Sequence, residues 1–67
     1  MDENRIVHQD RNLKIVRLPT KKNNKYKYRI EVTNGRVSKS YEEYCASDSE
    51  AFKISWLKLK DLQEKEL

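Results

Sequence analysis

Residues 25–41, KYKYRIEVTNGRVSKSY, decide the fold because apolar and polar residues alternate there on both sides of a turn signal. Apolar side chains recur at every second position between residues 26 and 32, which is typical of a strand with one buried face. Asn34-Gly35 then offers the two positive-φ positions of a type I′ turn. The stretch therefore predicts an antiparallel β-hairpin.

A two-residue turn fixes the pairing of the two strands. Val32 then faces Val37, and Lys39 falls opposite Ile30 on the apolar face. We expect Lys39 either to reach out over the sheet edge or to mark a bulge that shifts the register. The other face is basic and rich in hydroxyl groups, and its members are Lys27, Arg29, Thr33, Arg36, Ser38 and Ser40, with Glu31 as its one acid.

The residues before the hairpin predict one further strand. The run 13–18, LKIVRL, is mostly apolar, and Pro19 is expected to end it because proline has no amide donor for the sheet. Residues 20–24, TKKNN, form a polar connection of hairpin length. Residues 1–10 are mostly polar, and we expect them to form either a short edge strand or a flexible end.

A helix is predicted over residues 48–66. Ser47 and Glu50 have the spacing of a capping box, and no glycine or proline interrupts the segment. The link before it is expected to be less regular, with Tyr44 beneath the sheet and Cys45 half buried. At 100° per residue, the stripe predicted to cover the sheet consists of Ala51, Phe52, Ser55, Trp56, Leu59 and Leu62.

Three large side chains of the helix carry specific expectations. Trp56 belongs to the predicted core, so Trp56→Ala is expected to lower the free energy of unfolding by about 3–5 kcal/mol. Ile54 and Leu57 lie on the opposite flank of the helix. They are predicted either to be covered by the N-terminal segment or to form a small exposed contact patch for a protein.

Together these elements predict an α+β fold in a single domain of residues 1–67. A three-stranded antiparallel sheet over residues 13–41 is packed on one face by a single C-terminal helix, in the order βββα. The second face of the sheet is left open to a partner.

The formal net charge of +4 is unevenly distributed along the chain. Residues 11–39 contain ten bases and one acid, whereas the segments on either side of them carry an excess of acids. This distribution predicts a basic sheet backed by a mildly acidic helix, which would place a polyanion on one face of the molecule.

The composition argues against several other classes of function. Cys45 is the only cysteine and His8 the only histidine, so neither a disulfide within the chain nor a metal site or cofactor is predicted. No serine, aspartate or cysteine has a spacing that indicates an activated nucleophile, so we do not expect an enzyme or a small-molecule substrate. The chain has no apolar run of membrane-spanning length and no signal-peptide pattern, which predicts a cytoplasmic protein without a membrane partner.

The open, basic sheet face predicts nucleic-acid binding. Guanidinium, ammonium and hydroxyl groups suit phosphate oxygens and the base edges of a major groove, which a sheet ribbon can enter. The sequence therefore predicts a non-enzymatic module that binds duplex DNA, with Arg29 and Arg36 reading bases and the lysines contacting the backbone. The predicted contact residues are Lys21, Lys22, Lys25, Lys27, Arg29, Arg36, Ser38, Lys39 and Ser40.

The order of these motifs resembles a known module. YRIEV at residues 28–32, NGRVSKSY at residues 34–41, Ser49-Glu50-Ala51 and Trp56-Leu57 are similar to the arm-type DNA-binding domain of tyrosine recombinases, the integrases of phages and transposons. The resemblance covers residues 13–62, although this chain has extra residues before Ser49. It implies a sheet laid in the major groove, a mobile-element or phage origin, and DNA-facing roles for Lys27, Arg29, Arg36, Ser38 and Ser40.

The end of a double-stranded-RNA-binding domain has a similar order of elements. In that family lysines at the helix start bind phosphates, whereas Asp48 and Glu50 stand at the matching positions here.

A small interaction protein is the alternative from a different class, such as a phage-encoded inhibitor of a host nuclease or polymerase. It would bind its partner through the edge strand, through Ile54 and Leu57, or through the basic face. Charge reversal at Arg29 and Arg36 would abolish nucleic-acid binding. Asp substitutions at Ile54 and Leu57 would abolish binding of a protein partner.

Overall fold

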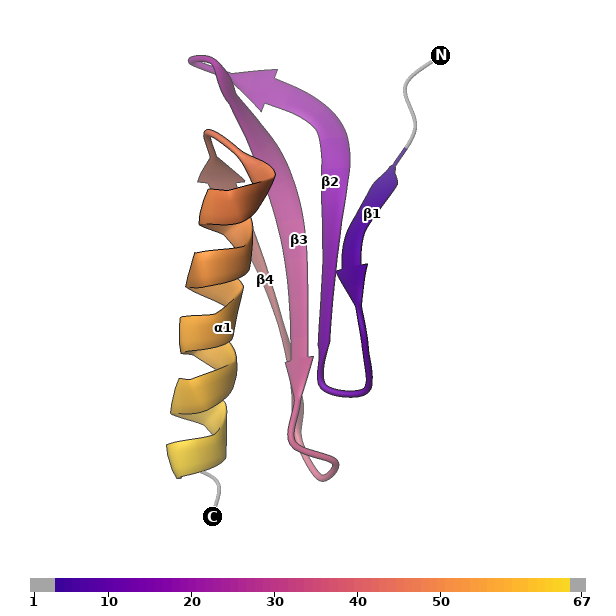
Figure 1. The fold of residues 1–67 in the computed structure, drawn as a ribbon, viewed down its shortest axis with the longest axis vertical. Coiled ribbons are helices and arrows are strands. Elements are labelled where there is room, and N and C mark those ends of the chain that lie inside the picture. The colour runs from indigo at the N-terminus through magenta and orange to yellow at the C-terminus, as the bar shows by residue number, and fades with distance from the viewer. Residues whose placement is uncertain (1–3, 66–67) are drawn as a thin grey trace.

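A computed structural model describes residues 4–65 as a single sheet and a single helix (Figure 1). The elements are β1 (Arg5–Gln9), β2 (Leu13–Lys22), β3 (Lys25–Thr33), β4 (Ser38–Cys45) and α1 (Asp48–Lys65). All neighbouring strands are antiparallel, and their order in the sheet is β1-β2-β3-β4. The predicted α+β class is confirmed, but the sheet has four strands where three were predicted.

The additional strand, β1, is an edge strand joined to β2 by a tight turn at Asp10. The Asp10 carboxylate accepts hydrogen bonds from the backbone amides of Asn12 and Leu13, both at 2.8 Å. The Asp10 amide donates to the Leu13 carbonyl at 2.8 Å. Aspartate and asparagine favour such turns because their side chains bond nearby amides, so this turn signal was present in the sequence. Because β1 has few apolar residues, the sequence pattern is also compatible with a flexible end.

Strand β2 does not end at Pro19 as predicted, because it continues to Lys22. The register between β2 and β3 shifts between Arg17 and Lys21, and Pro19 lies within this irregular stretch. A proline is tolerated at a bulge because the ladder needs no amide donor there.

The connection predicted over residues 20–24 is a two-residue turn at Asn23-Asn24, because residues 20–22 belong to β2. Lys22 pairs with Lys25, and the two asparagines between them have φ angles of 52° and 65°. Two consecutive positive φ angles are what a type I′ turn requires, and asparagine tolerates them better than most residues.

The turn predicted at Asn34-Gly35 is a four-residue connection instead. The Asn34 side chain accepts hydrogen bonds from the backbone amides of the two residues that follow Gly35, both at 2.9 Å. These bonds satisfy the amides of a wider loop and compete with the two-residue turn. Val32 therefore pairs with Lys39 rather than Val37. The shift is by an even number of residues, so the residues that remain in the two strands keep their predicted faces, whereas Arg36 and Val37 lie in the connection.

Strand β4 extends through the segment predicted as an irregular link. Tyr44 lies opposite Lys27 on the face away from the helix and is 40% exposed, so its predicted place beneath the sheet is wrong. Cys45 is fully buried rather than half buried, since it follows Tyr44 in the strand and points to the opposite face.

The start of α1 is confirmed by its cap. The Ser47 hydroxyl accepts a hydrogen bond from the Glu50 amide at 3.2 Å. The Glu50 carboxylate accepts from the Ala46 amide at 3.1 Å, one residue earlier than in a regular capping box. The predicted end of the helix at Glu66 lies outside the described residues.

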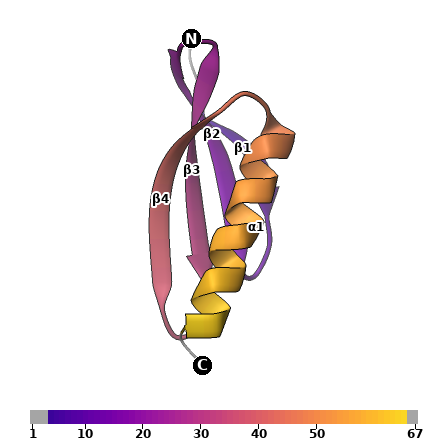
Figure 2. The same cartoon turned by 90° about the vertical axis from the view of Figure 1, so that its left-hand side faces the viewer.

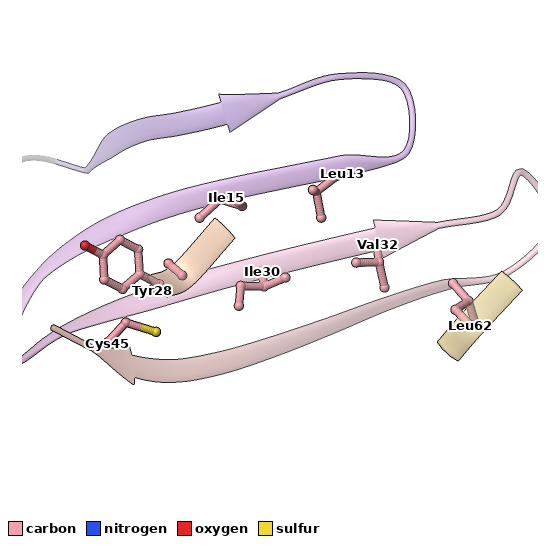
Figure 3. Close-up of a cluster of buried hydrophobic side chains, with 8 residues drawn as sticks. Leu13, Ile15, Tyr28, Ile30, Val32, Cys45 and Leu62 are labelled. Atoms are coloured by element: carbon pink, nitrogen blue, oxygen red, sulfur yellow. The ribbon is translucent and has the colours of Figure 1, made fainter. Parts of the chain in front are cut away.

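Helix α1 crosses one face of the sheet and forms the core with it (Figure 2). Figure 3 shows Tyr28 and Cys45 at one end of this core and Val32 and Leu62 at the other. The buried cluster comprises Leu13, Ile15, Tyr28, Ile30, Val32, Cys45, Ala51 and Leu62.

The predicted helix stripe is correct in its small residues and wrong in its aromatic ones. Ala51 and Ser55 are fully buried, whereas Phe52 and Trp56 are 41% and 51% exposed. The Tyr28 hydroxyl donates a hydrogen bond of 2.6 Å to Asp48 in the first turn of α1. This contact agrees with a rotation of the helix that places Ala51, Ser55 and Leu62 over the sheet and turns the two aromatic side chains toward its rim.

The Tyr28 hydroxyl provides a pH-dependent contribution to stability. Burial, followed by the hydrogen bond to Asp48, raises the pKa of Tyr28 to about 12. A raised pKa means that the folded state retains the proton, so this contribution is complete below pH of about 10 and is lost as the pH approaches 12.

Tyr28→Phe is therefore expected to lower the free energy of unfolding by about 1–3 kcal/mol at neutral pH. The difference from the wild type should shrink between pH of about 10 and 12, because the wild type then loses its phenol proton. Urea unfolding of both proteins at neutral pH and near the top of that interval measures this difference. An unchanged difference at the higher pH would contradict the role given to the hydroxyl.

Candidate nucleic-acid interface

The face of the sheet away from α1, here called the outer face, is covered by no other element of residues 4–65 (Figure 2). Strand register and alternation assign side chains to it, because successive residues point to opposite faces. Its main members are Ile6, Lys14, Val16, Lys22, Lys25, Lys27, Arg29, Glu31, Thr33, Ser38, Ser40, Glu42 and Tyr44.

Glu42 is an acid that the prediction for this face did not include. Its carboxylate lies 3.1 Å from Lys27 Nζ and 3.7 Å from an Arg29 guanidinium nitrogen. The hydrogen bond and charge of Lys27, together with Arg29, lower the pKa of Glu42. Glu42 is therefore ionised at neutral pH and partly neutralises two of the predicted contact residues.

Glu42 and Glu43 point to opposite faces, as expected of adjacent strand residues. Glu43 lies on the helix side, 3.3 Å from Lys58 Nζ of α1. The same alternation puts Glu42 on the outer face, but the prediction omitted it because this strand was expected to end at Tyr41.

The hairpin that joins β2 and β3, here called the basic hairpin (residues 20–27), groups four of the predicted contact residues. Lys22 and Lys25 are exposed on its outer-face side, and Lys27 follows them along β3. Lys21 lies on the helix side, with Nζ 5.3 Å from the centre of the Tyr26 ring. Within residues 4–65, Lys22 and Lys25 form no ion pair with a carboxylate.

The remaining predicted contact residues lie at the opposite end of the sheet. Arg36 is exposed in the β3–β4 connection, and Ser38, Lys39 and Ser40 follow it at the start of β4. A shallow hollow at this end lies between β4 and the β1–β2 turn, and its lining includes Asp10 and Glu31. The structure therefore separates Arg36 from Arg29, which lies at the middle of β3.

The predicted protein-contact residues line one shallow hollow, but they differ in exposure. Ile54 is half buried and packs against the core, whereas Leu57 is 57% exposed. Leu57 also lies beside Phe52 and Trp56 along a second shallow hollow on the exposed side of α1, here called the apolar patch. The prediction missed this patch because it assigned both aromatic residues to the core.

Trp56→Ala is accordingly expected to change the free energy of unfolding by about 1 kcal/mol or less, in contrast to the loss predicted from the helix stripe. The side chain is half exposed and its ring contacts Lys60 Nζ at 5.7 Å from the centre. Thermal or urea unfolding monitored by circular dichroism measures the change. Loss of cooperative folding would contradict this placement of Trp56.

Residues 4–65 contain no group of three or more histidine, cysteine, aspartate or glutamate side chains placed to hold a metal ion. In the same part of the chain, no helix is both long enough and apolar enough to cross a bilayer. The chain matches no known protein-family model, no curated protein and no solved structure.

Proposed function

We propose that this protein is a non-enzymatic nucleic-acid-binding module that contacts duplex DNA in the cytoplasm through its outer face. The observation that carries the proposal is the excess of bases on an uncovered sheet face. Lys14, Lys22, Lys25, Lys27 and Arg29 lie there against Glu31 and Glu42. Such a face attracts a polyanion, and neutralised phosphates release their counterions.

The ion pairs of Glu42 are compatible with phosphate binding. Lys27, Arg29 and Glu42 are all partly exposed, and ion pairs at such positions contribute little to stability because water and salt screen them. A DNA phosphate can therefore take the place of the carboxylate and accept the same hydrogen bonds.

The resemblance to integrase arm-type domains supports duplex DNA as the ligand and a phage or mobile element as the source. The motifs of that resemblance fall on β3, the β3–β4 connection, β4 and α1, and β1 is an addition to the three-stranded pattern.

The experiment that tests this function is the salt dependence of binding to random duplex DNA, followed by fluorescence anisotropy. With six phosphate contacts, affinity is expected to fall by about a thousandfold between 50 and 200 mM salt, and with four contacts by about a hundredfold. Absence of binding at the lower salt concentration would overturn the proposal.

Glu42→Gln is expected to tighten duplex binding. The substitution removes an acid from the outer face and releases Lys27 and Arg29 to bind phosphates. The slope of log affinity against log salt should become steeper by about one unit for each additional phosphate that the variant neutralises. Glu43→Gln is the matched control, because Glu43 lies on the helix side and pairs with Lys58. Equal effects of the two substitutions would show that net charge alone is responsible.

A second candidate function is binding to another protein, such as a host nuclease or polymerase, and the apolar patch favours it. Phe52, Trp56 and Leu57 are all more than two-fifths exposed and lie together on α1. Exposed aromatic residues that cluster in this way are typical of protein interfaces. If Leu57→Asp abolishes the function and charge reversal of the outer face does not, the apolar patch is the site.

A further inference from the structure

We infer that the basic hairpin is the element that reads the DNA, entering the major groove so that the side-chain amides of Asn23 and Asn24 contact adenine edges. This inference rests on the proposed function and adds to it the part of the protein that gives sequence preference.

The end of the basic hairpin continues beyond the rest of the sheet as a two-stranded ribbon. The last pair between β1 and β2 joins Arg5 to Arg17, and the last pair between β3 and β4 joins Tyr26 to Cys45. Lys22 and Lys25 pair beyond both of these points. Figure 2 shows the hairpin extending past the start of α1. A major groove, about 12 Å wide, accepts a ribbon of two strands.

Basic side chains lie on both sides of this ribbon. Lys22 and Lys25 belong to the outer face, and Lys21 lies on the helix side, beside the Tyr26 ring. No acid occurs in the sequence between Asp10 and Glu31. A ribbon in a groove has a phosphate backbone on each side. Basic side chains on both faces of the ribbon could therefore contact both phosphate backbones.

The tip of the ribbon carries side chains that can read a base. Asn23 and Asn24 are exposed, and neither side chain forms a hydrogen bond within residues 4–65. In contrast, Asn12 donates to the Thr33 carbonyl at 3.0 Å, and Asn34 accepts from loop amides. An asparagine amide can donate to N7 and accept from N6 of adenine in the major groove.

The arginines predicted to read bases are less suitably placed for this role. Arg29 lies within the flat part of the sheet and is paired with Glu42, and Arg36 lies at the opposite end of the molecule from the ribbon. Both arginines can contact phosphates. The end of the basic hairpin is better placed to enter a groove because it extends beyond the rest of the sheet.

The test compares two duplexes of the same sequence, one with adenine and one with 7-deazaadenine, which lacks the N7 acceptor in the major groove. The wild-type protein is expected to bind the adenine duplex roughly 5- to 150-fold more tightly, as one well-made asparagine contact would give. The Asn23→Gly/Asn24→Gly variant should bind both duplexes equally and keep the salt dependence of the wild type.

Glycine is the substitution of choice because it adopts positive φ without strain and therefore preserves the turn. Wild-type binding that is indifferent to the base analogue would overturn the inference without any variant. A glycine variant that keeps the wild-type discrimination would overturn it as well. In both cases salt-dependent binding would persist and the proposed function would stand, whereas absence of binding to either duplex would overturn the two together.

Discussion

Ile30→Ala is expected to lower the free energy of unfolding by about 2–5 kcal/mol. Ile30 is fully buried at the middle of β3, where it pairs with Ile15 on one side and Tyr41 on the other. The shorter side chain loses its burial and leaves a cavity between sheet and helix. Domains of this size have a total stability at or below the low end of about 5–15 kcal/mol, so we expect the variant to be largely unfolded at body temperature.

Ile6→Ala is the matched control because it makes the same chemical change at an exposed position. Ile6 lies in the edge strand β1 and is 56% exposed, so its substitution should cost about 1 kcal/mol or less. Urea unfolding of both variants measures the two losses. Equal losses would contradict the placement of the core between β3 and α1.

Lys22→Glu/Lys25→Glu is expected to weaken binding to random duplex DNA by at least about 25-fold at 50 mM salt. Non-specific affinities shared among six to ten phosphate contacts correspond to roughly fivefold per contact, and this variant removes two of the lysines that make them. The new carboxylates would also repel the phosphates. Both lysines are exposed at the end of the basic hairpin, so the fold should not change.

The control for this experiment is Lys53→Glu/Lys60→Glu on the exposed side of α1. Both double variants take the formal net charge from +4 to 0, so they differ only in where the charge is reversed. The control should retain most of the affinity of the wild type. A loss as large as that of the hairpin variant would show that long-range charge, and not a site, is responsible.

The faces of the strands could be predicted from the sequence, and the ends and registers of the strands could not. Alternation placed Tyr28, Ile30 and Val32 in the core, and burial confirms all three. The register of β4 depended on whether Asn34 bonds its own loop, which is a competition between local hydrogen bonds that the pattern of residues does not decide. Proline likewise failed to end β2 because a bulge removed the need for its amide.

The sequence predicted which kinds of residue form the site better than it predicted how these residues are arranged. The excess of basic residues along residues 11–39 indicated that the sheet forms the site. Glu42 belongs to the outer face because β4 is longer than expected. The aromatic residues of α1 were misplaced because an apolar stripe does not define how a helix is rotated on a sheet. That rotation agrees with the contact between Tyr28 and Asp48, which joins residues far apart in the sequence.

The most direct test of the central claim is a titration of the ¹⁵N-labelled protein with duplex DNA, followed by amide chemical shifts. We predict that the largest shifts occur in the basic hairpin and along the outer face at Lys27 and Arg29. Amides of the exposed side of α1, such as those of Lys53 and Trp56, should change little. Shifts confined to the apolar patch, or no shifts at any position, would contradict the assignment of the outer face as a nucleic-acid interface.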